Sequence, residues 1–228
     1  MKTTAIITAG GTGKRFLSDK PKQYHLLEGV PIIVRSMQPF SQSPLISNIV
    51  ISAAHDYIPL INQYKEEYHL DKITEIVTCG KERQYSVYNA LMTKTALESD
   101  IIMIHDAVRP FISQKLIQSL FEATLTFGAV FPGLPPKETI KQLVGNGIVG
   151  KTLDREHLVA VQTPESFKKD IIIKAFSSAI ESRYIGTDSS SLVENIGIDV
   201  HMIEGEENNI KITTLIDFII AKSILENI

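Results

Sequence analysis

A glycine-rich loop with basic side chains close behind it is the part of the sequence best suited to chemistry. Residues 8–16 read Thr-Ala-Gly-Gly-Thr-Gly-Lys-Arg-Phe and follow an apolar run directly. Glycines let backbone N–H groups approach a phosphate closely, because a side chain would block the approach. Four cations lie within nine residues of this region: Lys14, Arg15, Lys20 and Lys22. The pattern favours a phosphate site, and the alternative is a solvated turn with ordinary surface cations.

Two familiar phosphate loops do not match this sequence. A Walker loop would need glycine at position 8 and a serine or threonine at position 15, where Thr8 and Arg15 stand. A dinucleotide fingerprint that starts at Gly11 would need its third glycine at position 16, which is Phe16. The loop is therefore a candidate phosphate site of another kind.

The elements around the loop alternate between short β-rich runs and helical patterns. The predicted strands are residues 3–8, 48–53, 73–78, 101–105 and 129–132. Several of them are apolar at consecutive positions, which is typical of a sheet that is buried on both faces. Strands that alternate with helices favour parallel pairing through right-handed crossovers. We therefore predict an α/β fold, with a Rossmann-like, mostly parallel twisted sheet and helices on both faces.

Helix boundaries are indicated at three places. Pro31 suits the first turn of a helix. Thr214 and Asp217 have the spacing of a capping box, and the segment after them is apolar almost all round, so we expect it to pack deeply. Asp188 is expected to cap another helix through Glu194.

One stretch, at about residues 134–155, breaks the alternation. A Gly-Asn-Gly turn at 145–147 separates candidate strands at 139–144 and 148–152. An isolated hairpin is marginally stable in water. We therefore expect a β-arm that protrudes from a single domain, residues 1–228, and serves dimerisation.

Composition excludes several classes of protein. The 228 residues are 43% hydrophobic and 21% charged, which is enough apolar side chain for a sizeable core. The net charge of -3 argues against a nucleic-acid partner, although residues 1–40 are basic. One cysteine, Cys79, excludes a disulfide framework. No apolar run approaches the roughly 20 residues of a membrane helix, and no signal peptide is apparent, so we expect a cytoplasmic protein without a membrane partner.

The motifs together resemble those of the 2-C-methyl-D-erythritol 4-phosphate cytidylyltransferase family. The resemblance runs nearly end to end, with the motifs in family order. Besides the glycine loop, it is carried by PKQY at 21–24, GKERQYSVYNAL at 80–91, HDAVRPF at 105–111, TLDR with VQTPESF at 152–167, and NIKITT at 209–214.

This resemblance implies an enzyme that transfers CMP from CTP to 2-C-methyl-D-erythritol 4-phosphate and releases pyrophosphate, in the non-mevalonate route to isoprenoids. A sister family, ribitol 5-phosphate cytidylyltransferase, shares the glycine loop and the 105–111 and 209–214 motifs. The arm, with Thr139 and Arg155, is closer to the isoprenoid family. A ribitol 5-phosphate enzyme and a non-catalytic nucleotide-binding module remain as alternatives.

The resemblance also implies roles for individual residues. Arg15 and Lys22 match residues that stabilise the transition state, and Lys211 and Arg155 match residues that hold and orient the sugar phosphate. CTP binding is implied for Gly10, Gly11, Thr12, Gly13, Gly80, Arg83, Ser86, Asp106 and Ala107. Contact with the polyol phosphate is implied for Arg109, Thr139 and Thr163, with the arm reaching the site of a partner subunit.

The reaction needs positioned cations more than acid–base chemistry, because the attacking phosphate oxygen is already an anion at neutral pH. Magnesium, or another divalent cation, is expected to bridge the triphosphate, since it prefers phosphates and one or two carboxylates. Asp106 is the candidate carboxylate, and a turn-capping role is its alternative. We expect His105 to support its strand by a hydrogen bond and Cys79 to be a small buried hydrophobe.

The sequence departs from the residues usual in that family at several positions. Tyr85 and Ser189 stand where an aspartate is frequent, and Glu138 stands where an aspartate commonly precedes Thr139. Residues 163–166 read TPES in place of the commoner TPQS. None of these departures removes a residue that is assigned to the chemistry.

Overall fold

One twisted sheet organises the chain, whose structure is a computed structural model that describes residues 1–11 and 20–227. Its eight strands, among the described residues, are β1 (Thr3–Ala9), β4 (Asn48–Ala53), β5 (Ile73–Thr78), β6 (Ile101–Asp106), β7 (Ala129–Leu134), β10 (Ala160–Val161), β11 (Glu165–Lys168) and β12 (His201–Glu204). The strand order is β10-β7-β11-β6-β1-β4-β5, and β12 pairs with β7.

Four of the seven strand pairs in this sheet are parallel, as the sequence predicts. Strand β1 lies between β6 and β4 and is parallel to both, β4 is parallel to β5, and β12 is parallel to β7. Strand β11 is antiparallel to β6 and β7, and β10 is antiparallel to β7. All five strands expected from the sequence are present, so the α/β assignment is confirmed.

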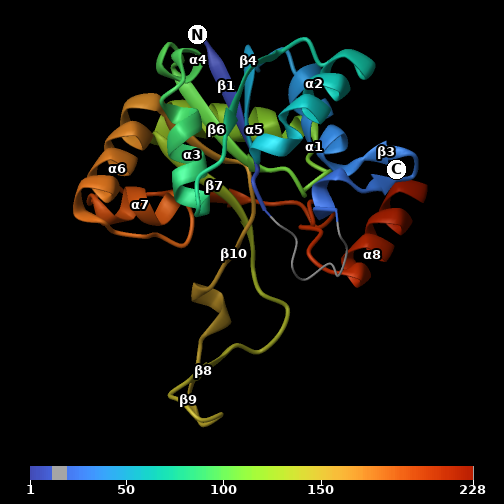
Figure 1. Cartoon of the computed structure of the whole chain (residues 1–228). Coiled ribbons are helices and arrows are strands. Elements are labelled where there is room, and N and C mark those ends of the chain that lie inside the picture. The colour runs from blue at the N-terminus through green and yellow to red at the C-terminus, as the bar shows by residue number, and fades with distance from the viewer. Residues whose placement is uncertain (12–19, 228) are drawn as a thin grey trace.

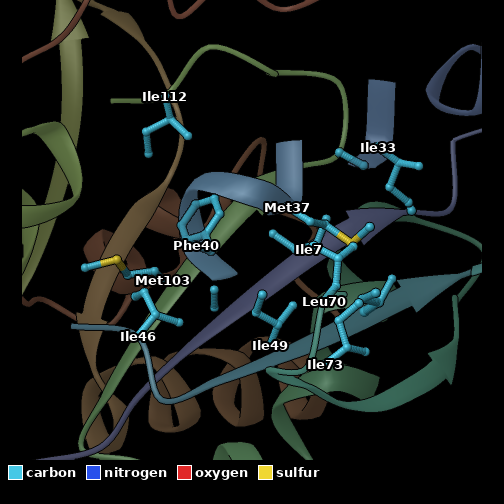
Figure 2. Packing of buried hydrophobic residues seen from close by; sticks show 14 of the residues in the cluster. Ile7, Ile33, Met37, Phe40, Ile46, Ile49, Leu70, Ile73, Met103 and Ile112 are labelled. Atoms are coloured by element: carbon cyan, nitrogen blue, oxygen red, sulfur yellow. The ribbon is translucent and has the colours of Figure 1, made fainter. Parts of the chain in front are cut away.

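Helices cover both faces of this sheet (Figure 1). They are α1 (Ile32–Gln42), α2 (Ile58–Glu67), α3 (Arg83–Leu91), α4 (Lys94–Leu97), α5 (Gln114–Phe127), α6 (Lys169–Ser182), α7 (Ser189–Asn195) and α8 (Leu215–Glu226). Neighbouring residues on a strand point to opposite faces. Ile7 therefore joins the core that contains Met37 and Phe40 of α1 (Figure 2), whereas Ile6 joins the core beneath α3 and α6.

Reciprocal capping boxes form at two of the helix starts. Thr214 and Asp217 form the expected capping box at the start of α8. Asp188 caps α7, but its reciprocal partner is Ser191 and not Glu194 as predicted. The partner is Ser191 because that residue occupies the third helical position, from which a side chain reaches the capping residue.

The expectation that the last segment packs deeply is wrong for most of α8. Only Ala221 is buried among the residues of this helix that the structure describes. One side of the helix, including Phe218 and Ile224, packs on a small cluster around Leu27. The other side leaves four large apolar residues exposed: Leu215, Ile216, Ile219 and Ile220. A helix that is apolar all round contacts only as many neighbours as the fold places beside it, and α8 lies at the periphery (Figure 1).

The predicted β-arm is present and stands away from the main sheet (Figure 1). Its strands β8 (Lys141–Leu143) and β9 (Val149–Thr152) pair only with each other and are exposed along their length. They are shorter than expected, and their pairing is irregular between Gln142 and Leu143. The turn follows the predicted chemistry, since Asn146 and the glycines on either side of it all have positive φ. No helix among the described residues is long and apolar enough to cross a membrane.

Candidate active site

A cavity of about 440 Å³ lies where β1, β5 and β6 end, at the carboxyl edge of the sheet. Ligands of open α/β sheets bind at this edge. The residues that line the cavity are Thr8, Ala9, Gly10, Gly11, Lys22, Gln23, Gly80, Lys81, Glu82, Arg83, Ser86, Asp106, Ala107, Val108, Lys211 and Thr213.

Most of the residues singled out in the sequence meet in this cavity. They are Gly10, Gly11, Lys22, Gly80, Arg83, Ser86, Asp106, Ala107 and Lys211. Their positions in the sequence extend from Gly10 to Lys211. The strand order β6-β1-β4-β5 brings the ends of β1, β5 and β6, which carry most of them, to one edge of the sheet. Thr12, Gly13 and Arg15 lie outside the described residues.

Close packing explains the glycines at two points of the wall. A Cβ atom on Gly10 would lie 2.7 Å from the Cβ of Cys79, and one on Gly80 would lie 2.3 Å from the Cβ of Tyr85. Gln23 holds the start of the glycine loop in place, because its amide donates hydrogen bonds to the carbonyl oxygens of Ala9 and Gly11, at 2.7 and 2.9 Å. Cys79 is half-buried against Gly10, so its predicted role as a small packing residue holds only in part.

The second loop is held from within by a serine. The Gly80 N–H donates a hydrogen bond to the Ser86 hydroxyl at 3.1 Å, and that hydroxyl donates to the Glu82 carbonyl at 3.0 Å. Ser86 belongs to the first turn of α3, so the helix carries the loop at a fixed position. Gly10, Gly11 and Gly80 therefore border the cavity with backbone groups that no side chain of their own covers.

Asp106 is the central charged group of the cavity. Its Oδ2 atom lies 2.7 Å from Lys211 Nζ, and its Oδ1 atom accepts from Arg83 Nε at 3.3 Å and from the Thr8 hydroxyl at 3.2 Å. Burial alone would raise the pKa of this carboxyl, but the adjacent Arg83 and Lys211 outweigh burial and hold it far below the usual range of an aspartate. Asp106 is therefore a permanent anion that fixes two cations.

A buried hydrogen-bond chain supports Asp106 from behind. The Thr163 hydroxyl accepts from the backbone N–H of Asp106 and contacts Nδ1 of His105, both at 3.1 Å. Nε2 of His105 lies 2.9 Å from the Arg109 carbonyl oxygen, which can only accept. Nε2 must therefore carry the proton, and Nδ1 accepts from Thr163. His105 supports its strand end as predicted.

Arg109 and Thr163 are placed beneath the cavity and not on its described lining. Arg109 is buried and donates to the carbonyl oxygens of Asn209 at 2.7 Å and Val161 at 3.4 Å. Burial lowers the pKa of its guanidinium group. These contacts make Arg109 a clamp between two loops, and its predicted contact with substrate stays a prediction.

Thr139 and Arg155 lie on the arm, are exposed, and are absent from the described lining of the cavity. The Arg155 guanidinium donates to the Lys137 carbonyl oxygen at 2.8 Å. Within one chain, the structure therefore does not bring these two residues to the cavity.

Several residues of this site are not predicted by the sequence motifs. Thr8, Gln23 and Thr213 border the cavity, although each lies within or beside a motif that was recognised. Glu165 is fully buried behind Arg83, at 3.3 Å from that guanidinium. Its position within a TPES motif was visible, but no spacing rule indicated that it would face an arginine 82 positions away.

Comparison with known proteins gives consistent results. A family model described as 2-C-methyl-D-erythritol 4-phosphate cytidylyltransferase matches residues 3–227. A protein of that name from Syntrophus aciditrophicus is 40% identical over 227 residues, covering 99% of this chain and 96% of its own. Another, from Clostridium novyi, is 40% identical over 228 residues and covers 100% and 98%.

Solved structures agree with this assignment. The crystal structure of 4-diphosphocytidyl-2C-methyl-D-erythritol synthase from Anaerococcus prevotii superimposes with a TM-score of 0.85, at 28% identity, covering 99% of this chain and 98% of its own. The 2-C-methyl-D-erythritol 4-phosphate cytidylyltransferase of Francisella tularensis gives a TM-score of 0.83, at 32% identity, with 98% and 99% covered.

The buried imidazole of His105 predicts a dependence of stability on pH. Burial lowers its pKa to about 4, against about 6.5 in an unfolded chain. The unfolded chain therefore binds this proton at a higher pH than the native protein, and stability falls as the pH drops from about 6.5 towards 4. We expect this residue to remove about 2 kcal/mol of unfolding free energy between pH 7 and about pH 4.5.

Chemical denaturation at these two pH values checks the expectation. His105→Gln, whose amide can still donate to the Arg109 carbonyl, should lose about 2 kcal/mol less than the wild type over this interval. His55→Gln changes an exposed histidine and should keep the wild-type dependence. An equal pH dependence in His105→Gln and the wild type would contradict the prediction.

Proposed function

The chain belongs to the 2-C-methyl-D-erythritol 4-phosphate cytidylyltransferase family, and on that premise we propose that its cavity transfers CMP from CTP to 2-C-methyl-D-erythritol 4-phosphate. The observation that carries the proposal is that Lys22 and Lys211 meet Gly10 and Gly11 of the glycine loop around one cavity. A binding surface for a polyanion needs this combination of cations and bare backbone N–H groups.

In this reaction a phosphate oxygen of the acceptor attacks the α-phosphorus of CTP. The new O–P bond forms as the bond to the β-phosphate oxygen breaks, and the electron pair leaves with pyrophosphate. The nucleophile is an anion, so no proton has to be removed. His105 fits this chemistry as a supporting group, because both of its nitrogens are engaged below the cavity.

We place the triphosphate on the backbone of Gly10 and Gly11, and the cytidine beside the second loop, at Gly80, Arg83 and Ser86. Both loops border the cavity. Lys211 is 42% exposed at its side chain, and Lys22 lines the same space. Charge develops on the α-phosphoryl oxygens in the transition state, and these two lysines can stabilise it there. Arg15 completes the proposed catalytic set, together with Arg155 from the arm.

A divalent cation fits the donor set of the cavity in one respect. Asp106 lines the cavity, and its two oxygens accept three donors among the described residues, against about four lone-pair positions on a carboxylate. No group of three metal-ligating side chains occurs among the residues that the structure describes. Asn209 is fully buried and its NH₂ group donates to the Thr163 carbonyl oxygen, so we do not count it as a metal ligand. We propose that Asp106 would supply the protein carboxylate for a bound Mg²⁺, which would neutralise phosphate charge.

We propose further that the protein is a homodimer in which the arm of one subunit completes the site of the other. Two observations support this. The arm exposes apolar residues near its turn, among them Leu143, Val144 and Ile148, and its Thr139 and Arg155 do not reach the cavity of their own chain. A cytoplasmic location, without nucleic-acid or membrane partners, stays a prediction from composition.

The acceptor is tested by incubating the protein with CTP, Mg²⁺ and either polyol phosphate, and measuring pyrophosphate. Ribitol 5-phosphate has an unbranched five-carbon chain and one more hydroxyl group, whereas the proposed acceptor has a four-carbon chain with a methyl branch. A misplaced carbon group of this size is commonly worth about tenfold or more in kcat/KM. We expect at least that preference for 2-C-methyl-D-erythritol 4-phosphate. Equal or reversed rates would contradict the proposed acceptor, and CTP binding without turnover of either would indicate a binding module.

Lys22→Ala tests the cation assignment. Loss of one positioned transition-state donor typically costs about 10²–10³ in rate, so we expect kcat to fall by that factor. Thermal unfolding should be little changed, since Lys22 is only half-buried. Lys174→Ala, an exposed lysine of α6, is the matched control and should keep the wild-type kcat. Wild-type turnover in Lys22→Ala would remove this residue from the mechanism.

Mixing two inactive variants tests the dimer. If the arm acts on the partner's cavity, a heterodimer of Arg155→Ala and Lys22→Ala contains one site with both native side chains. Random re-association should then restore about a quarter of the wild-type sites. If the arm serves its own chain, mixing restores no activity, and this result would contradict the proposal. Sedimentation that finds an active monomer would contradict it as well.

A further inference from the structure

Glu165 is a buried acid that the proposed mechanism does not use. It lies on β11, is 0% exposed, and points toward the start of α7 and the guanidinium of Arg83. A buried carboxylate is costly unless charge and hydrogen bonds compensate it. Its partners therefore show what it does.

Four donors surround this carboxylate. One oxygen accepts from the backbone N–H and the hydroxyl of Ser190, at 2.8 and 2.9 Å. The other accepts from the backbone N–H of Ser189 and from Arg83 Nη2, both at 3.3 Å. The acid therefore satisfies the first N–H groups of α7 and binds an arginine of the cavity at the same time.

Arg83 is fixed on three sides by these neighbours. Its Nε donates to Asp106, its Nη1 to the Ser189 hydroxyl and its Nη2 to Glu165, all at 3.3 Å. A guanidinium group is planar, so three acceptors in different directions determine both its position and its plane. Its side chain remains 31% exposed, toward the cavity that it lines.

We propose that Glu165 is the positioning residue for Arg83, and through it for the bound nucleotide. This proposal rests on the proposed function only in taking the cavity as the CTP site. Without Glu165, Asp106 would be the only carboxylate among the described residues that contacts Arg83 or Lys211. With Glu165 behind Arg83, two carboxylates face two cations. Arg83 therefore keeps its position when bound phosphates attract Lys211 away from Asp106.

Replacement by glutamine should disturb this arrangement specifically. The amide has one acceptor oxygen and an NH₂ group that only donates. Whichever way it is turned, its NH₂ group faces either Arg83 and the Ser189 N–H, or the Ser190 N–H, so donors meet donors. In either orientation Arg83 loses its charged rear partner, because it then faces the NH₂ group or an uncharged oxygen, although shape and volume are almost unchanged.

The structure also offers a way to return the charge. The Ser189 hydroxyl lies 3.3 Å from Arg83 Nη1, so an aspartate at position 189 places a carboxylate against the same guanidinium. Position 189 is the first residue of α7, where an acidic side chain is favoured by the helix dipole. Glu165→Gln with Ser189→Asp therefore moves the charge without removing it.

The test compares four proteins by CTP titration: wild type, Glu165→Gln, the double variant, and Glu98→Gln as an exposed control. For Glu165→Gln we expect the Kd and KM for CTP to rise about tenfold, as for the loss of a charged hydrogen bond. We expect kcat at saturating CTP to change much less. The double variant should recover most of the affinity, and Glu98→Gln should match the wild type.

Two outcomes overturn the proposal. One is an unchanged Kd for CTP in a folded Glu165→Gln protein. The other is a double variant that regains thermal stability but not affinity, because Glu165 would then serve α7 alone. If the Glu165→Gln single variant fails to fold, the double variant still decides, since wild-type affinity requires the relocated charge. CTP binding is measured directly by calorimetry, so failure of the wild type to turn over the polyol phosphate counts against the proposed function and not against this inference.

Discussion

A buried aspartate between two cations is the constraint on which the site depends. Asp106 ends the central strand β6, and its carboxylate stays ionised because Arg83 and Lys211 lie against it. The free-energy cost of burying that charge is offset only when Arg83 and Lys211, which are distant in the sequence, lie beside it. The cavity forms at this point of the fold. The strand order that places β6 beside β1 brings the end of β1 and the start of the glycine loop to the same point.

The cations of the cavity are held in two different ways. Arg83 is anchored by three acceptors, including the fully buried Glu165, whereas Lys211 has a flexible, half-exposed side chain bound at one atom. A triphosphate can compete for Lys211 with little rearrangement, but displacing Arg83 would leave Glu165 buried without its charge partner. The structure thus separates a cation suited to follow phosphate charge from one suited to fix the orientation of the ligand.

Sequence patterns were sufficient for the strands and for the linear motifs. Five apolar runs became strands because burial on both faces leaves a strong local signal. They were insufficient for α8, since an apolar helix does not reveal how many of its sides find a neighbour. They also could not show that the unusual residues Glu165 and Ser189 meet at Arg83, because that contact joins three separate segments. The motif around Arg109 was sufficient to predict it as a site residue. The direction of its side chain beneath the cavity was not predictable, because it depends on where segments 161–163 and 209–211 lie.

In the proposed dimer, the nucleotide half and the acceptor half of the site are built on different physical grounds. The first is a network of buried charges and close backbone contacts within one chain, so a change at Asp106, Arg83 or Glu165 affects the others. The second, in the proposed dimer, comes from an exposed hairpin whose strands bond only to each other. Side chains on such an arm, including Thr139 and Arg155, can vary without disturbing the core. In the proposed dimer, acceptor preference can therefore change by substitutions in the arm that keep Arg155, while the nucleotide stays positioned by the buried network.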